Sequence, residues 1–579
     1  MWRNILELTR GEPSKKICSY RWYSEVNNDG KLSIKKNIAV KTAEYAYIVR
    51  IDKNRQTTTN FQTFYDEIQQ GSVFLTQDYV KVRITLKRGI TIHEAHAYPV
   101  RNFTKHPKQQ KESSINQLNI LFINVDSLSH SAAVRSLPMF YEALENDADS
   151  IIMKGHTVVG DGTTAQFTGI LVGDMERNLP EARRGIKNSS SVDQWPFIFK
   201  EYNKKGYATV YSEDRPGTEA FTFRLNGFDA KPTDRYLRPF WRGAAGFLNK
   251  RLFKNSPRCH HQLELKFLKR LLMNYKDTPV FSFFAMGSAH DVYANFKLFD
   301  EDFLDFHQFL DTSHARRNTL VVWFGDHGAR SSKYRATMVG KLEERLPFMA
   351  FSFPRWLKNK YPLKFQNFKQ NAKIMTSHFD VFSTLKHVLN FDGEFENNHK
   401  WGKSLFTNIT SLNRTCSEAG ILEHWCPCIQ YEPMSIESEL SKILAVKLIG
   451  LMNKKLQRLK ATKKLCEPVS LSRIIRVQQI TTNDHVRKFS KSFRKGCDGC
   501  GARMEDDKKY TSDSYEVVLE TGPNSAAYFE ATLVQNIRTR EITVNGDISR
   551  INKYGNQPHC IAEEFPHLRQ YCYCKQQLP

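Results

Sequence analysis

The sequence predicts an α/β fold, with a doubly wound, mainly parallel sheet and a smaller Cys-rich C-terminal region. Two observations support this prediction. Between about residues 116 and 410, apolar runs of strand length alternate with amphipathic segments of helix length. Nine of the 11 cysteines lie from Cys416 onward, where the composition changes. Continuous apolar strands separated by helices indicate a parallel sheet that is covered on both faces.

The strand-length runs are LNILFINV, YATVYS, PVFSFFAMG, TLVVWFG and PFMAFSF. Between them, segments such as DQWPFIFKEYNKK, LELKFLKRLLMNY and DFLDFHQFLDTS place apolar residues at helical spacing. In sheets of this kind the functional groups gather at the carboxyl ends of the strands. Candidate functional residues are therefore those that follow each apolar run.

The chain divides into three predicted regions. Residues 1–115 form an N-terminal extension with short strand-like pieces, AEYAYIVRI and GSVFLTQDYVKVRITL, and lead into KHPKQQKESSINQ, which is typical of a linker. Residues 116–410 form a catalytic-type domain, and residues 411–579 form the Cys-rich C-terminal region.

The charge balance favours anionic partners. The chain has 85 Lys and Arg against 61 Asp and Glu, a formal net charge of +24. This excess predicts an anionic small-molecule, lipid or glycan substrate. The basic residues are scattered and no known nucleic-acid module with interleaved aromatics is present, so nucleic acid is not an expected partner. No apolar run reaches the roughly 18 residues that a transmembrane segment needs.

The cysteines and four glycosylation tripeptides predict an extracellular protein, or one of the secretory-pathway lumen. Clustered cysteines favour disulfides in an oxidising compartment. The first residues, MWRNILELTRGEPSKK, lack the apolar core of a signal peptide, so no signal peptide is expected in this chain. The N-glycosylation tripeptides begin at Asn102, Asn188, Asn408 and Asn413.

The Cys-rich region has a second interpretation. Cys497 and Cys500 could join Cys572 and Cys574 around a zinc ion. The glycosylation tripeptides favour disulfides instead. Because 11 is an odd number, at least one thiol is left over or pairs elsewhere, and the isolated Cys18 is the candidate.

Three apolar runs stop at acidic residues or histidines. LNILFINV is followed by Asp126, PVFSFFAMG by His290 and Asp291, and TLVVWFG by Asp326 and His327. Each has an ordinary alternative, because an Asp after a strand often caps a helix and a lone His often faces water. Together, these carboxylate oxygens and imidazole nitrogens suit zinc, manganese or magnesium. The sequence therefore predicts a divalent-metal site at these strand ends.

The segment VVGDGTTAQFTGILVG predicts a tight turn followed by a helix. Thr163 or Thr164 would lie at the N-terminus of that helix, where a threonine is an ordinary cap. The functional alternative is a hydroxyl that loses its proton on a metal and becomes a nucleophile. The helix N-terminus would then donate to the anionic group under attack.

The order of these motifs resembles the alkaline phosphatase and sulfatase superfamily, and more closely the nematode-expanded DUF229 family of extracellular, sulfatase-like proteins. The resemblance runs from about residue 40 to the end. The motifs that carry it are VDSLS, GDGT, DHG followed by EERLP, TSHFDVFSTLKHVL, GKSL, ISRINKYG and the CYC ending.

The resemblance implies an alkaline-phosphatase-like fold with one or two metal ions. Asp126, Asp326 and His327 would be ligands, and Thr163 would be both ligand and nucleophile. Thr163 is preferred over Thr164 because the superfamily usually has proline two places after the nucleophile, although Ala165 stands there in this chain. His290 would be a catalytic candidate, as a substrate-facing or second-metal residue, and Asp291 and His378 would be possible second-metal or substrate residues. His378 and Asp380 lie in a helix-start element that is more often structural.

Formylglycine sulfatases need a Cys or Ser nucleophile in the context Cys-x-Pro-Ser-Arg, which this chain lacks. The leading hypothesis is therefore a secreted or lumenal metal-dependent hydrolase or transferase of a phosphate ester. The alternative is a catalytically silent extracellular protein that binds anionic glycans or proteins through its basic surface.

Overall fold

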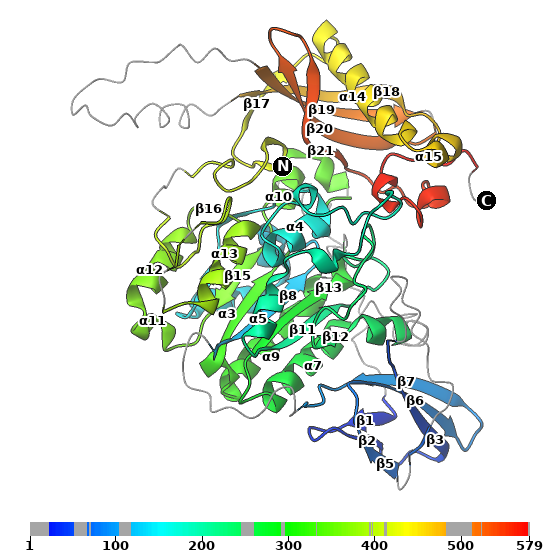
Figure 1. Ribbon diagram of the computed structural model, residues 1–579, viewed down its shortest axis with the longest axis vertical. Coiled ribbons are helices and arrows are strands. Elements are labelled where there is room, and N and C mark those ends of the chain that lie inside the picture. The colour runs from blue at the N-terminus through cyan, green and yellow to red at the C-terminus, as the bar shows by residue number, and fades with distance from the viewer. Residues whose placement is uncertain are drawn as a thin grey trace.

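The computed structural model describes residues 22–50, 66–68, 71–102, 117–244, 260–290, 296–331, 333–392, 395–396, 398–409, 414–481, 512–522 and 524–576. Figure 1 shows the N-terminal strands and the C-terminal sheet at opposite ends of a central α/β domain. In the described part of the chain, no helix has the length and apolar character needed to cross a membrane.

The central sheet has seven strands, and five of them run parallel. The prediction of a mainly parallel sheet is confirmed. In pairing order the strands are β12 (Arg235–Tyr236), β11 (Ala208–Glu213), β13 (Val280–Met286), β8 (Asn119–Val125), β14 (Thr319–Phe324), β15 (Met349–Ser352) and β9 (Ser150–Ile152).

The run PFMAFSF forms β15, which is antiparallel to β14, as is β9 to β15. Phe324 at the end of β14 pairs with Met349 at the start of β15. The segment between them contains helix α10 (Met338–Arg345) and returns to the sheet at the end where β14 stops. A chain that re-enters at the same end must run in the opposite direction.

Helices cover both faces of this sheet, as the alternation of strands and helices predicts. Along β8, Ile120 and Phe122 belong to one buried cluster, and Leu121 and Ile123 to the other. Successive side chains of a strand point to opposite faces, so each face needs its own layer of helices. One face holds α4 (Gly162–Leu171), α5 (Ile198–Lys204) and α13 (His378–Leu389), and the other holds α3 (Pro138–Asn146), α7 (His260–Asn274) and α9 (Asp300–Thr312).

Shorter elements complete the central domain. β10 and β16 pair in parallel outside the main sheet. The bounds are α2 (His130–Ser136), β10 (Gly155–Thr157), α11 (Leu357–Lys360), α12 (Pro362–Asn371) and β16 (Met375–Ser377).

The N-terminal strands form two small antiparallel sheets around their own buried cluster. Strand β6 alternates buried and half-buried side chains along most of its length, which is the pattern of a sheet with one face against a core. The strands are β1 (Ser24–Val26), β2 (Lys31–Ile34), β3 (Val40–Tyr47), β4 (Asp66–Glu67), β5 (Ser72–Phe74), β6 (Tyr79–Leu86) and β7 (Thr91–Ala97).

The C-terminal unit is a five-stranded antiparallel sheet with two helices packed on it. Its elements are β17 (Gln430–Met434), α14 (Glu439–Gln457), α15 (Lys460–Leu465), β18 (Ser470–Thr481), β19 (Ser512–Gly522), β20 (Ala527–Asn536) and β21 (Ile542–Arg550).

The predicted disulfides are present in this region. They join Cys416 to Cys426, Cys466 to Cys572, and Cys560 to Cys574. Disulfide bonding removes Cys572 and Cys574 from the alternative zinc site, because a disulfide sulfur is no longer a thiolate ligand. Among the described cysteines Cys428 is free and exposed. The other four cysteines, Cys18, Cys259, Cys497 and Cys500, lie outside the described residues.

Three of the four predicted glycosylation asparagines are exposed, namely Asn102, Asn188 and Asn408. Asn413 lies outside the described residues. Exposure is the condition that a glycan on these side chains requires.

Two buried histidines predict that the protein loses stability in mild acid. Burial, together with the charges of nearby cations, lowers the pKa of His96 and of His424 to about 3. In the unfolded chain a histidine binds its proton below about pH 6.5. The unfolded state therefore binds more protons as pH falls below that value, and each histidine reduces the free energy of unfolding by up to about 1.4 kcal/mol per pH unit.

Urea denaturation at about pH 7 and about pH 5 measures this loss. His424→Gln should make the free energy of unfolding less dependent on pH, because glutamine does not titrate. The control is His314→Asn: His314 is exposed, and its backbone φ of 59° suits asparagine. An unfolding free energy that is equal at the two pH values would contradict the prediction.

Candidate metal centre and active site

Asp126, Asp326 and His327 converge at the carboxyl ends of two neighbouring strands. β8 lies between β13 and β14, and the pairs Met286 with Val125 and Phe324 with Asn124 show that the three strands end together. One ligand atom of each of Asp126, Asp326 and His327 lies within 4.8 Å of the other two. Three donors at this spacing can contact one ion.

The turn after β8 holds the carboxylates of Asp126 and Asp326 by hydrogen bonds. Ser127 has a left-handed backbone, with a φ of 67°. Its N–H donates to Asp326 Oδ1 over 2.9 Å, and its hydroxyl donates to Asp126 Oδ1 over 3.0 Å. One serine thus holds the acids of both strands.

The two glycines of GDHG are required by close backbone contacts. A Cβ on Gly325 would lie 1.9 Å from the carbonyl oxygen of Leu128, and a Cβ on Gly328 would lie 2.1 Å from that of Glu343. Only glycine fits where two backbones approach so closely. Gly325 and Gly328 therefore let the loop that carries Asp326 and His327 pack against the backbones of Leu128 and Glu343.

The hydrogen bonds of His327 leave one ring nitrogen available as a ligand. Nδ1 lies 2.8 Å from the carbonyl oxygen of Gly328, which can only accept, so Nδ1 carries the proton in the neutral ring. Nε2 then carries a lone pair and lies 3.3 Å from Asp326 Oδ2. This pattern, with the outer nitrogen held by a carbonyl, is usual for metal-ligating histidines.

The electrostatics of the site also suit a cation. Asp326 Oδ2 is buried and accepts no hydrogen bond. Burial lowers the pKa of His327, but the charges of Asp326 and Asp126 outweigh it and raise that pKa. A buried carboxylate oxygen without a donor costs free energy unless a cation satisfies it. The donor set of two carboxylates and one imidazole fits zinc or manganese, and less closely magnesium.

Thr163 faces this group, whereas Thr164 does not. Thr163 Oγ1 lies 3.5 Å from His327 Nε2. The buried Thr164 hydroxyl donates to the carbonyl oxygen of Ala220 over 3.0 Å. Neither threonine caps α4, whose N-cap is Asp161.

The turn that presents Thr163 is closed by Gln166. Its side-chain oxygen accepts from Val159 N–H at 2.9 Å, and its amide donates to the carbonyl oxygens of Gly160 and Gly162. Gly162 has a φ of 67°, a conformation that glycine adopts without strain. The sequence GDGTTAQ therefore folds into a rigid turn that points one hydroxyl at the cluster.

Two arginines that the sequence analysis did not single out lie beside this turn. Arg330 donates to Asp161 Oδ1 over 2.6 Å, and Arg224 donates to the Asp161 carbonyl oxygen over 3.3 Å. Burial raises the pKa of Asp161, but Arg330 and Arg224 outweigh it and lower that pKa. Arg330 comes two residues after DHG, which is the only sequence signal for it.

The other predicted residues are not part of the three-ligand group. His290 follows the short helix η5 (Gly287–Ala289), and its Nε2 lies 4.0 Å from Asp126 Oδ1. His378 is buried at the start of α13, with its ring 4.6 Å from that of His156. Burial lowers the pKa of His378 to about 3. Asp291 lies outside the described residues.

Asp380 has a structural role. Its carboxylate accepts two hydrogen bonds from Arg414, at 2.6 and 2.9 Å, and one from Ser377 N–H at the start of α13. The capping box that Ser377 and Asp380 form starts the helix. This agrees with the structural interpretation of the motif TSHFD.

Helix α10, which ends in the motif EERLP, contacts all three segments that carry the site. Its last three residues bond to the turn after β8, to the DHG loop and to the strand that leads to Thr163. The contacts are Glu343 Oε2 with Ser129 Oγ (3.2 Å), Glu344 O with Gly328 N (2.9 Å) and Arg345 O with Val158 N (3.1 Å). A shift of α10 would therefore move every part of the site.

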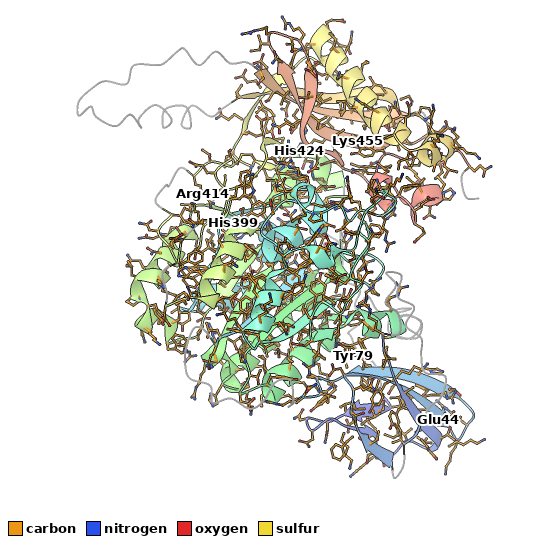
Figure 2. All side chains as sticks on the ribbon, in the orientation of Figure 1. Glu44, Tyr79, His399, Arg414, His424 and Lys455 are labelled. Atoms are coloured by element: carbon orange, nitrogen blue, oxygen red, sulfur yellow. A yellow bond between two sulfur atoms is a disulfide. The ribbon has the colours of Figure 1, made fainter. Side chains whose placement is uncertain are left out.

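A buried ionic network, made of Arg335, Lys341, Arg345, Glu516 and Glu530, joins this region to the C-terminal sheet. Glu530 on β20 lies 3.1 Å from Arg335, 3.2 Å from Arg345 and 3.7 Å from Lys341, and Lys341 also pairs with Glu516 on β19. Burial raises the pKa of Glu530, but the three cations outweigh it and hold that pKa well below its usual value. In Figure 2 the nearby His424 lies where the C-terminal unit meets the central domain.

A model of the family described as "Protein of unknown function (DUF229)" matches residues 9–475. The chain belongs to the DUF229 family. This confirms the resemblance that the ordered motifs indicated. No protein with a curated description matches this DUF229 chain.

Among solved structures, the DUF229 chain is similar to the zinc complex of the C-terminal periplasmic domain of EcEptC from Escherichia coli. Identity is 11% and the TM-score 0.38, covering 52% of this chain and 89% of that one. It is also similar to the lipoteichoic acid synthase LtaP from Listeria monocytogenes, with 10% identity, a TM-score of 0.35, and coverage of 82% and 98%. A third is the lipooligosaccharide phosphoethanolamine transferase A from Neisseria meningitidis, with 12% identity, a TM-score of 0.34, and coverage of 49% and 57%.

Proposed function

We propose that this DUF229 chain is a secreted or lumenal metal-dependent hydrolase or transferase that acts on a phosphate ester, with Thr163 as nucleophile. The observation that supports it most is the position of Thr163 Oγ1, 3.5 Å from His327 Nε2 and beside a group of three potential ligands. A hydroxyl at the N-terminus of a helix, next to a cation site and two arginines, suits attack on an anionic ester.

Each side chain of the site has a role in this proposal. Asp126, Asp326 and His327 would hold a divalent ion. When bound, such an ion lowers the pKa of a coordinated hydroxyl and polarises a phosphoryl oxygen. Arg330 and Arg224 lie beside the helix N-terminus and would stabilise the negative charge on the phosphoryl group.

The reaction would proceed in two steps on Thr163. The hydroxyl would give up its proton to His290, which lies beside Asp126, and Oγ1 would form a bond to phosphorus while the bond from phosphorus to the ester oxygen breaks. The leaving alkoxide would take that proton from His290. Water, in a hydrolase, or an acceptor alcohol, in a transferase, would then attack phosphorus, the bond from phosphorus to Oγ1 would break, and the proton of the attacking hydroxyl would pass to Oγ1.

Metal content tests the proposal directly. Purified protein supplied with zinc, manganese or magnesium should retain a near-stoichiometric amount of one of them after dialysis. Asp326→Asn should weaken retention by about tenfold or more, because the amide removes the negative charge from an oxygen that no other group satisfies. Elemental analysis measures both results.

The matched control is Asp311→Asn, an acid-to-amide change at a half-exposed residue that pairs with the buried Arg316 and the exposed Arg355. It should leave metal content unchanged. Wild-type protein that retains no divalent metal would refute the proposal and favour the alternative of a silent protein that binds anionic glycans or proteins.

A further inference from the structure

An open cavity of about 1160 Å³ lies between the N-terminal strands and the central domain. Arg50 and Tyr79 line it from the N-terminal side, and Figure 2 shows Tyr79 at this junction. Lys200 and Lys204 on α5 and Lys231 before β12 line it from the central domain. The cavity exceeds the roughly 300–1000 Å³ of a typical small-molecule site.

The cavity is remote from the metal centre. Asn203 and Asp234 line it beside Thr209, near the start of β11, whereas Asp126 and Asp326 follow the ends of β8 and β14. β11 has six residues and is parallel to those strands, so it spans roughly 20 Å from one end of the sheet to the other. A ligand in the cavity therefore leaves the metal centre free.

Basic side chains outnumber acidic ones in the cavity wall, and the acids are already engaged. Asp78 Oδ1 accepts from Val100 N–H at 2.9 Å and lies 3.4 Å from Arg235. Asp234 Oδ2 accepts from Thr209 N–H at 2.8 Å and from Asn203 at 2.9 Å. The charged lining residues are Arg50, Arg101, Lys200, Lys204, Lys231 and Arg235, against Asp78 and Asp234. Arg101 also pairs with Asp277 outside the wall, so the excess of positive charge comes mainly from Arg50 and the three lysines.

Arg50 is held without a counter-charge. Its guanidinium donates to the carbonyl oxygens of Ala230 and Asp229, each over 3.1 Å, and lies over the ring of Tyr236. Within the described residues, no carboxylate lies at ion-pairing distance from it. Carbonyl oxygens accept from its two terminal nitrogens but do not neutralise its positive charge.

The two lysines of α5 repel each other across one helical turn. Lys200 Nζ donates to backbone carbonyl oxygens of residues 193 and 195. Burial lowers the pKa of Lys200, Asp193 counteracts this, and the charge of Lys204 lowers the pKa further. An anion between the lysines would relieve the repulsion, since like charges at i,i+4 are unfavourable.

We propose that this cavity binds a carbohydrate-sized ligand that carries several sulfate or phosphate groups. Its positive charges come from both walls, so a ligand with several separated anionic groups matches them better than a single small anion. The ligand could be a sulfated oligosaccharide or a phosphorylated sugar or cyclitol, since both present tetrahedral anions on a polyhydroxylated frame. Binding of a ligand in this cavity does not require the reaction at the metal centre.

Isothermal titration of the full chain at physiological salt tests the proposal with two probes, a heparin-derived oligosaccharide and inositol hexakisphosphate. At least one probe should bind with a defined stoichiometry, and the tighter one identifies the sulfated or the phosphorylated source. Lys204→Gln/Lys231→Gln should weaken that binding about tenfold, through lost electrostatic attraction. Both lysines are exposed, and unchanged thermal unfolding of the variant would show that its fold is intact.

The matched control is Lys460→Gln/Lys464→Gln, which removes two exposed lysines from α15 at the other end of the molecule. It should change affinity by less than about twofold. Equal weakening in the two double variants would show that the probes bind the basic surface in general and would overturn the proposal. Failure of both probes to bind with saturation would overturn it too.

Discussion

Replacing Thr163 with alanine is expected to reduce turnover of a phosphate ester by a factor on the order of 10³ or more. The alanine cannot form the bond to phosphorus, whereas the bonds from Ser127 N–H to Asp326 and from His327 to the Gly328 carbonyl oxygen do not involve Thr163 and should hold the cluster in place. Metal content and the midpoint of thermal unfolding should stay close to wild type. Initial rates on phosphodiester and phosphomonoester substrates measure the effect.

Two neighbouring substitutions control for this result. Thr163→Ser should keep part of the activity, because a serine hydroxyl can also ionise beside a metal. Thr164→Ala should leave the chemical step nearly unchanged and cost about 1 kcal/mol of stability, because it removes the hydrogen bond to Ala220. Loss of activity in Thr164→Ala together with an active Thr163→Ala would move the nucleophile to Thr164.

Replacing Glu530 with alanine is expected to have the largest effect on stability, a loss of about 3–5 kcal/mol. Glu530 is fully buried and faces Arg335, Lys341 and Arg345, whose side chains are also buried. Removing one partner of a buried ionic group leaves the other charges without compensation, and this costs more than the net contribution of the pair. Urea denaturation monitored by tryptophan fluorescence measures the free energy of unfolding.

The control is Glu520→Ala on the neighbouring strand β19. Glu520 pairs with Arg473, whose side chain is 65% exposed, so this ion pair is screened by water. Such surface pairs contribute at most about 1 kcal/mol. Similar losses for Glu530→Ala and Glu520→Ala would contradict the view that the buried network holds the C-terminal sheet to α10.

The sequence predicts the fold and the grouping of the three candidate ligands at the strand ends because both depend on local patterns. Apolar runs such as LNILFINV and TLVVWFG have the length and composition of buried parallel strands. Parallel strands share one carboxyl edge, so the residues that follow them, Asp126 and Asp326, are expected to lie near each other. The choice of Thr163 over Thr164 came from resemblance, and the structure shows a physical difference between the two hydroxyls.

The residues that sequence reasoning missed depend on contacts between distant parts of the chain. Arg224 lies in a loop without periodicity, and it reaches Asp161 only because of how that loop folds over α4. Glu530 looks like an exposed acid in an alternating strand, yet it is buried against three cations from another region. The direction of β15 was also not predictable from its composition, because an apolar run of that length suits either direction.

The buried ionic network extends the folding unit of this protein beyond the end of the family match. The family match stops at residue 475, inside β18, whereas the carboxylates that neutralise α10 lie further along, on β19 and β20. A fragment cut at the boundary of the match would contain the ligands and Thr163 but leave Arg335, Lys341 and Arg345 without Glu516 and Glu530. The folding unit thus extends past the family match, and a recombinant fragment that keeps this network must include β19 and β20.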